Sequence, residues 1–192
     1  MQLQQIQQKI IQLLEKELSP RLFYHDVRHT LDVFAVTEEL CKLEGISEND
    51  TFLLKIAALF HDSGFIISRY DHEMNSCKIA RDLLPDFGLS EEQIQIICGM
   101  IMATKIPQTP KTELEKIICD ADLDYLGRPD YTLIANQLFL ELKSYDVIQD
   151  ESAWRRLQIN FLKSHHYFTK TNMERRTAMK EKQLQKIMST HE

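Results

Sequence analysis

Glycine, proline and long apolar runs are scarce in this chain. It has 192 residues with only 5 Gly and 5 Pro, which is too little turn chemistry for a fold of many strands. Its apolar stretches fall short of the roughly 18 residues that a membrane span needs, and the glutamine-rich start does not have the form of a signal peptide. We therefore expect a helical protein of the cytoplasm that does not associate with membranes.

Paired cysteines and a positive net charge are also lacking. The four Cys residues stand apart without a CxxC pair, so we expect buried thiols in a reducing compartment rather than disulfides or a zinc finger. Acidic residues outnumber basic ones by 29 to 23, which gives a formal net charge of -6. Because the overall field of such a protein repels polyanions, we expect no nucleic acid polymer as a partner.

What the chain has instead is helical periodicity, with 43% hydrophobic residues. Leu3, Ile6, Ile10 and Leu14 form one apolar stripe on a first helix that ends near Pro20. The stripe favours packing on the protein's own core over a dimer seam, because two heptads are too few for a coiled coil. A homodimer remains an open alternative.

The same spacing predicts eight further helices, and with them an all-α fold. In the second helix we expect Leu31 and Leu43 to point inward, and the third is apolar nearly all round and should lie at the centre. The basic stretch from Lys180 to Lys186 reads as solvated surface. We expect one domain over 1–192, a bundle of eight or nine helices, with the motifs in about 24–128 and helices of 130–192 completing the fold. The predicted ranges after the first helix are about 26–44, 47–64, 72–84, 91–105, 112–127, 131–145, 151–168 and from 172 onward.

Histidines or aspartates that could share one site occur at three places in this pattern. His25 and His29 are four residues apart at a predicted helix start, so they lie on one face and can share a site. His61 and Asp62 directly follow an apolar run that is bound for the core. A buried charge needs a partner, and a metal ion is one of the few adequate ones. The segment DADLD at 120–124 follows another apolar run and adds carboxylates in a similar position.

The segments YHDVRHT, AALFHDSGF and CDADLDYLG together resemble the HD-domain superfamily of metal-dependent phosphohydrolases, whose signature is H…HD…D. The resemblance spans about 24–128 and implies an all-helical fold. It supplies no substrate. Asp120 is the alternative to Asp122 as the last metal ligand. On this resemblance the metal ligands are His29, His61, Asp62 and Asp122.

The resemblance also implies catalytic residues. His25 matches the first histidine of the YHNxxH variant in cyclic-nucleotide phosphodiesterases, where it looks like the general acid for the leaving oxygen. Here Asp26 replaces the usual Asn, and the additional histidines of the dinuclear cyclic-dinucleotide branch are missing, which argues against both substrates. His72 and Glu73 are the next candidates, either to hold a second metal or to orient the attacking water. The alternative for Glu73 is an ordinary acid at a helix start.

The ligand set itself restricts the metal. Two imidazoles and two carboxylates suit Mn, Fe, Co, Ni or Zn better than Mg or Ca, which prefer cages made of oxygen alone. We expect one divalent transition-metal ion, with a second as an alternative. Four protein ligands leave room for a water and a substrate oxygen in a shell that can reach six.

Basic side chains near the motifs and in the last third are candidates for binding the substrate's phosphate. A lysine at the end of a helix can equally compensate the helix dipole, and basic residues of the last third can belong to a solvated surface. The candidates for phosphate binding are Lys105, Arg128, His166 and Lys170.

The predicted function is hydrolysis of a phosphate ester of a small molecule through a metal-activated water. Nucleotides are the leading substrate class, and the choice between monoester and diester is open. One alternative is a di-iron oxygenase of the same fold, which needs extra histidine ligands, and only His72 is an obvious supply. Another is a non-catalytic module that senses a nucleotide or a metal.

Overall fold

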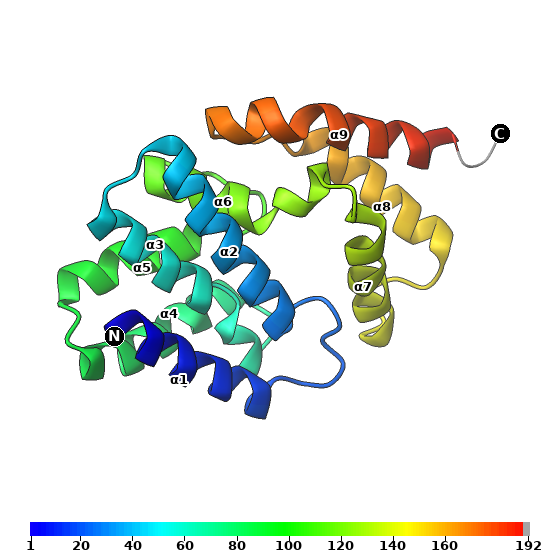
Figure 1. Cartoon of the computed structure of the whole chain (residues 1–192). Helices are drawn as coiled ribbons and strands as arrows, with labels where there is room; N and C mark the ends of the chain where they lie inside the picture. Colours follow the sequence, from blue (N-terminus) through cyan, green and yellow to red (C-terminus); the bar gives the residue numbers. More distant parts are fainter. Residues whose placement is uncertain (190–192) are drawn as a thin grey trace.

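The computed structural model describes residues 1–189, which form nine α-helices and three short 3-10 helices (η1–η3), with no strand. The all-α fold of eight or nine helices is therefore confirmed (Figure 1). The elements are α1 (Gln2–Glu17), α2 (Val27–Glu44), α3 (Glu48–Phe60), η1 (Ser63–Ile66), α4 (His72–Leu83), η2 (Leu84–Phe87), α5 (Glu91–Ala103), α6 (Glu113–Asp122), η3 (Asp124–Gly127), α7 (Tyr131–Ser144), α8 (Glu151–Ser164) and α9 (Lys170–Ser189).

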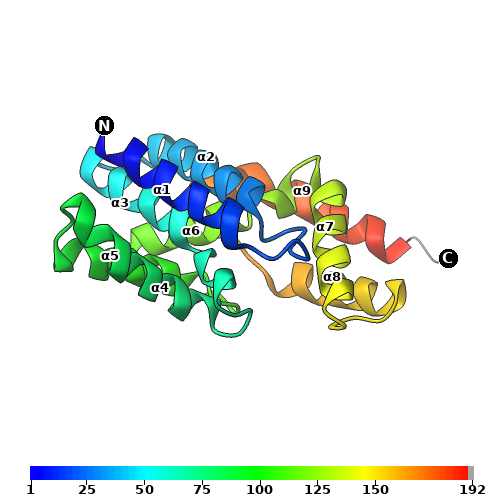
Figure 2. The ribbon, with the colours of Figure 1, turned by 90° about the horizontal axis from the view of Figure 1, so that it is seen from below.

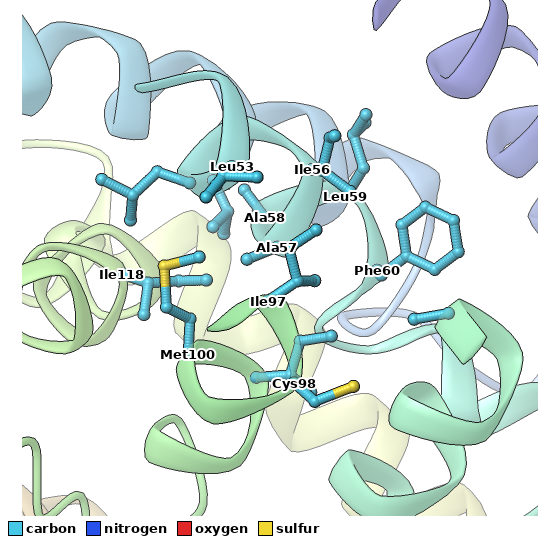
Figure 3. Close-up of a cluster of buried hydrophobic side chains, with 14 of the residues drawn as sticks. Leu53, Ile56, Ala57, Ala58, Leu59, Phe60, Ile97, Cys98, Met100 and Ile118 are labelled. Atoms are coloured by element: carbon cyan, nitrogen blue, oxygen red, sulfur yellow. The ribbon is translucent and has the colours of Figure 1, made fainter. Parts of the chain in front are cut away.

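Helix α3 lies at the centre of the larger of two apolar cores, as its composition predicts. Its residues from Leu54 to Phe60 are buried except for Lys55, and α1, α2, α5 and α6 pack around it. Figure 3 shows its side chains lying against Ile97 and Met100 of α5 and Ile118 of α6. The stripe of α1 is buried in this same core rather than left free, since Ile6, Ile10 and Leu14 are at most 1% exposed.

A second, smaller core joins η3, α7 and α8. Figures 1 and 2 show α7 and α8 at one end of the molecule, with α9 running past η3. Tyr24, which precedes α2, belongs to this second core and so connects it to the motif-bearing part of the chain. Leu123, from the segment DADLD, belongs to the second core as well. That residues 1–192 form one domain stays a prediction.

The structure corrects three local expectations. Helix α8 ends at Ser164, before the histidine pair that we placed inside it. In α2, Leu31 and Leu43 are exposed, because the buried face of this helix includes His29, Thr30 and Thr37, which turn toward the site and the core. Lys180 is buried instead of solvated, and its ammonium donates to the carbonyl oxygen of His165.

The four cysteines are all buried, in agreement with the sequence. Among the helices of residues 1–189, none has the length and apolar character that crossing a bilayer requires.

The turn that follows α3 is packed so closely on α4 that it requires glycine. A Cβ on Gly64 would lie 1.9 Å from the carbonyl oxygen of His72 and 2.6 Å from the nitrogen of Ser76. We predict that Gly64→Ala lowers the free energy of unfolding in urea by about 2–3 kcal/mol, because backbone atoms must move apart. Gly99 in α5 is the control, since its Cβ would meet nothing closer than 3.8 Å.

Gly99→Ala should raise the same free energy by about 0.5–1 kcal/mol, because alanine loses less backbone entropy in a helix. Equal effects of the two substitutions would contradict the tight contact at Gly64.

Candidate metal centre

The first ligand candidate, His29, is fixed by the start of α2. Asp26 is the N-cap of this helix, and its Oδ1 accepts hydrogen bonds from the backbone N–H groups of Arg28 (2.8 Å) and His29 (3.1 Å). The cap sets the first turn, so the His29 side chain points into the protein, where it is buried. Asp26, the second residue of the first His-Asp pair, thus caps the helix and holds its neighbour in place.

His61 and Asp62 come from the end of α3. The helix stops at Phe60, and the hydroxyl of Ser63 donates to the Phe60 carbonyl at 2.8 Å. The Nδ1 of His61 lies 2.8 Å from the carbonyl oxygen of Ala58 and donates its proton there, which leaves Nε2 as a lone-pair ligand. Because the chain leaves the helix at this point, both neighbouring side chains reach the same place.

Ser76 ties this turn to α4. Its hydroxyl accepts from the Gly64 N–H at 2.8 Å and donates to the His61 carbonyl at 2.7 Å, and the residue is fully buried. No sequence pattern singles out Ser76, because a serine inside an amphipathic helix is not distinctive. The structure shows that it positions the backbone of a ligand candidate.

The aspartates of DADLD face three different directions at the end of α6. Asp122 points to the two histidines, with its Oδ1 at 3.2 Å from His29 Nε2 and 3.6 Å from His61 Nε2. Asp120 instead accepts from the Phe168 and Thr169 N–H groups at 2.9 and 2.8 Å, and thereby anchors the loop before α9. Asp124 accepts from Arg176 of α9 at 2.7 Å.

Four candidate ligand atoms converge at one point. The two Nε2 atoms of His29 and His61 are 3.2 Å apart, and Asp62 Oδ2 lies 3.3 and 3.1 Å from them. Together with Asp122, the two histidines form a group able to hold a metal ion. Bonds of about 2.1 Å, usual for such ligands, give neighbouring ligand atoms separations of about 3.0–3.4 Å. The separations of 3.1 to 3.3 Å fit this spacing, and the 3.6 Å between Asp122 Oδ1 and His61 Nε2 is slightly longer.

Hydrogen bonding and burial also fit a cation. Asp62 Oδ2 is buried and has no polar partner among the described residues other than the Nε2 atoms of His29 and His61, and a buried carboxylate is costly unless it is fully paired. The nitrogen and oxygen donors suit a divalent transition metal. His29, His61 and Asp122 therefore fit one such ion, and Asp62 as a fourth ligand stays a prediction.

Without a bound cation, the charges in the cluster are balanced by protons that the histidines share with the carboxylates. Burial alone lowers the pKa of His29, but its hydrogen bonds to Asp122 and Asp62 outweigh burial and raise the pKa to about 9. Burial raises the pKa of Asp122, and the two histidines outweigh it and lower the pKa to about 2. The cluster therefore attracts positive charge strongly.

His25 stands beside the cluster with an acidic partner of its own. Its Nδ1 is hydrogen-bonded to Oε1 of Glu141, a buried residue of α7 whose Oε2 accepts from the backbone N–H groups of Tyr24 (2.8 Å) and His25 (3.0 Å). The ring also stacks on Phe65, with centroids 4.2 Å apart. Sequence reasoning missed Glu141, since one acid among the leucines of α7 reads as a solvated position.

His72 and Glu73 lie at the start of α4, next to Asp62. His72 Nε2 is 3.4 Å from Asp62 Oδ1 and 3.4 Å from Glu73 Oε1, and Glu73 is buried. Burial lowers the pKa of His72, but the nearby Asp62 outweighs burial and raises it. Asp62 thus faces the two ligand histidines with one oxygen and His72 with the other.

The four phosphate-binding candidates are not gathered at this cluster. The Lys105 ammonium lies 2.7 Å from Asp71, and Arg128 is held by Asp32 at 2.9 Å and Asp130 at 2.8 Å. Lys170 is exposed and near Glu174, and the exposed His166 borders a separate small cavity. Their role in binding phosphate stays a prediction.

A cavity of about 250 Å³ opens at the cluster. Its polar end is formed by ligand candidates and their neighbours, and its other walls come from η3, α7 and α8. The residues at the polar end are His25, Asp62, His72, Glu73 and Asp122.

Comparison with known proteins agrees with this geometry. Residues 26–124, slightly more than half of the chain, match the family described as HD domain. This chain belongs to the HD-domain family. Members of that family are in general metal-dependent hydrolases, and the cluster lies within the matched segment. The chain matches no curated protein and no solved structure.

Substituting Asp122 and Asp120 one at a time tests which of them binds the metal and which anchors the loop before α9. Asp122→Asn should abolish stoichiometric binding of Mn²⁺ or Zn²⁺ in calorimetry, because one of the two carboxylate ligands loses its charge. Asp120→Asn should keep the binding and lower the free energy of unfolding by about 1–2 kcal/mol, since it weakens the hydrogen bonds to residues 168 and 169. If only Asp120→Asn lost metal binding, Asp120 would be the ligand and Asp122 would not.

Metal affinity should also depend on pH. Because the pKa of His29 is about 9 without a metal, the ion must displace a proton at any lower pH. Between pH 6 and 8 the association constant should rise about tenfold per pH unit for each proton displaced. Calorimetry in buffers of different ionisation enthalpy counts these protons. Binding that is independent of pH and releases no proton would contradict the proton-sharing cluster.

Proposed function

We propose that this protein is a metal-dependent phosphohydrolase that hydrolyses a phosphate ester of a small molecule. The observation that carries the proposal is the His25–Glu141 pair, because His25 lines the same cavity as the candidate ligands Asp62 and Asp122. A metal site alone serves binding or catalysis equally well, whereas a histidine that is held by a buried carboxylate beside it is suited to proton transfer.

Each residue of the candidate site has a distinct role in this proposal. His29, His61, Asp62 and Asp122 hold a divalent ion, which supplies a nucleophile near neutral pH by acidifying water and withdraws charge from the phosphoryl oxygens. His25 donates a proton to the leaving oxygen from the ring nitrogen that Glu141 does not occupy. Glu141 fixes the tautomer and orientation of the His25 ring, since its two oxygens bind both the ring and the local backbone.

The neighbours of Asp62 are proposed to orient the attacking water or to hold a second ion. Asp62 Oδ1, His72 and Glu73 lie together for either role. An oxygenase would need more nitrogen ligands around a second ion, and His72 is the only further histidine close to Asp62 among the described residues. The hydrolase is therefore favoured over the oxygenase.

A hydrolysis screen tests the proposal. Chelator-stripped protein would be supplied separately with Mn²⁺, Fe²⁺, Co²⁺, Ni²⁺ or Zn²⁺ and offered nucleotides, cyclic nucleotides and simple phosphate esters. We expect turnover with at least one metal and none in Asp62→Ala, which loses a ligand. Tight metal binding without any turnover would reject the hydrolase and favour a sensing module.

The acid and its partner are tested in the active metal form. Glu141→Gln should lower kcat by about 100-fold, because the His25 ring loses the partner that orients it, and metal affinity should not change. His25→Ala should lower kcat at least as much. Reduced metal binding in Glu141→Gln would instead show a structural role for this carboxylate.

A further inference from the structure

Away from the metal ligands, the cavity is walled by hydrocarbon and aromatic surface. This part lies between η3, α7 and α8, and several of its side chains belong to the second apolar core. Most of them are only half-buried, so they face an open space rather than filling it. The residues that matter here are Leu138, Leu142, Trp154, Leu157 and Phe161.

Two of the few polar groups in this apolar part already have partners within the protein. The amide of Gln158 donates to the hydroxyl of Tyr131 at 2.8 Å, and the hydroxyl of Thr104 donates to the carbonyl of Ile101 at 2.8 Å. A ligand group rich in donors and acceptors would lose its water here without replacement, which is unfavourable. An apolar group would lose only unfavourable hydration.

The charges of the residues that line the cavity also favour an apolar ligand group. None of the described residues that line the cavity is a lysine or an arginine. Three basic residues near the motifs, Arg28, Lys105 and Arg128, are paired with aspartates. A metal centre can neutralise one phosphate, but a di- or triphosphate would bring further charges with no partner in the cavity.

We propose that the substrate is a phosphate ester of a small apolar alcohol, with its single phosphate at the metal ligands and its aryl or short alkyl group against α7 and α8. This inference rests on the proposed hydrolase function and specifies its substrate. The volume of about 250 Å³ is below the range of about 300–1,000 Å³ that is usual for drug-sized ligands. The alcohol is therefore limited to one ring or a short chain.

The protein carries its own probe for this site. Trp154 is the single tryptophan of the chain and lines the apolar part of the cavity. Its fluorescence can follow titration of Zn²⁺-loaded protein with methyl-, butyl- and hexylphosphonate, which cannot be hydrolysed. Affinity should rise about two- to fourfold for each methylene that enters the cavity. Equal affinities for the three phosphonates, or tighter binding of AMP than of hexylphosphonate, would overturn the proposal.

Two matched variants locate the effect. Leu157 lines the cavity and is 43% exposed, whereas Leu140 is 40% exposed and does not line it. Leu157→Glu should weaken hexylphosphonate binding about tenfold and leave methylphosphonate unchanged, because only the longer chain reaches this wall. Leu140→Glu should leave both affinities unchanged. Equal losses in the two variants would overturn the assignment of the chain to this wall.

Hydrolysis of the corresponding phosphate monoesters distinguishes the two proposals. If kcat/KM rises from methyl to hexyl phosphate, both stand. If the phosphonates bind with the expected chain-length dependence but no ester is hydrolysed with any metal, the hydrolase fails and the apolar site stands. If methyl phosphate and AMP are hydrolysed as well as hexyl phosphate, the hydrolase stands and the apolar specificity fails.

Discussion

Two buried carboxylates and two buried imidazoles share one small volume, and this concentration of charge is the constraint on which the rest of the structure depends. Asp62 and Asp122 cannot both be ionised in the interior without positive charge between or beside them. His29 supplies it as a protonated ring when no metal is bound, as its raised pKa of about 9 indicates. A divalent ion supplies the same positive charge without protons. Metal binding therefore displaces protons from the cluster, and the affinity for the metal depends on pH.

The segment DADLD connects this balance to the C-terminal helices. One aspartate faces the cluster, the one before it holds the loop that leads into α9, and the one after it binds Arg176 of α9. The end of α6 thus fixes a ligand and two distant elements together. Helix α7 contributes Glu141 to His25, so residues beyond the matched family segment complete the acid side of the site.

The helices and the motif residues could be predicted from the sequence, because both correspond to patterns over a few neighbouring residues. Apolar spacing predicted α1 to α9 to within several residues, and the His-Asp pairs stood out against apolar runs. It could not find Ser76 or Glu141, whose importance comes from partners that lie 15 and 116 residues away in sequence. Nor could it show that Lys105 and Arg128 are paired with aspartates, because such pairs depend on how the helices are arranged.

The central claim is that one cation belongs between His29, His61, Asp62 and Asp122. A crystal grown with Mn²⁺ and measured at a wavelength with strong manganese anomalous scattering tests it most directly. The account predicts a strong anomalous peak within bonding distance, about 2.0–2.3 Å, of all four side chains. A fully occupied peak elsewhere, or four intact side chains hydrogen-bonded to one another with no peak at saturating Mn²⁺, would contradict it.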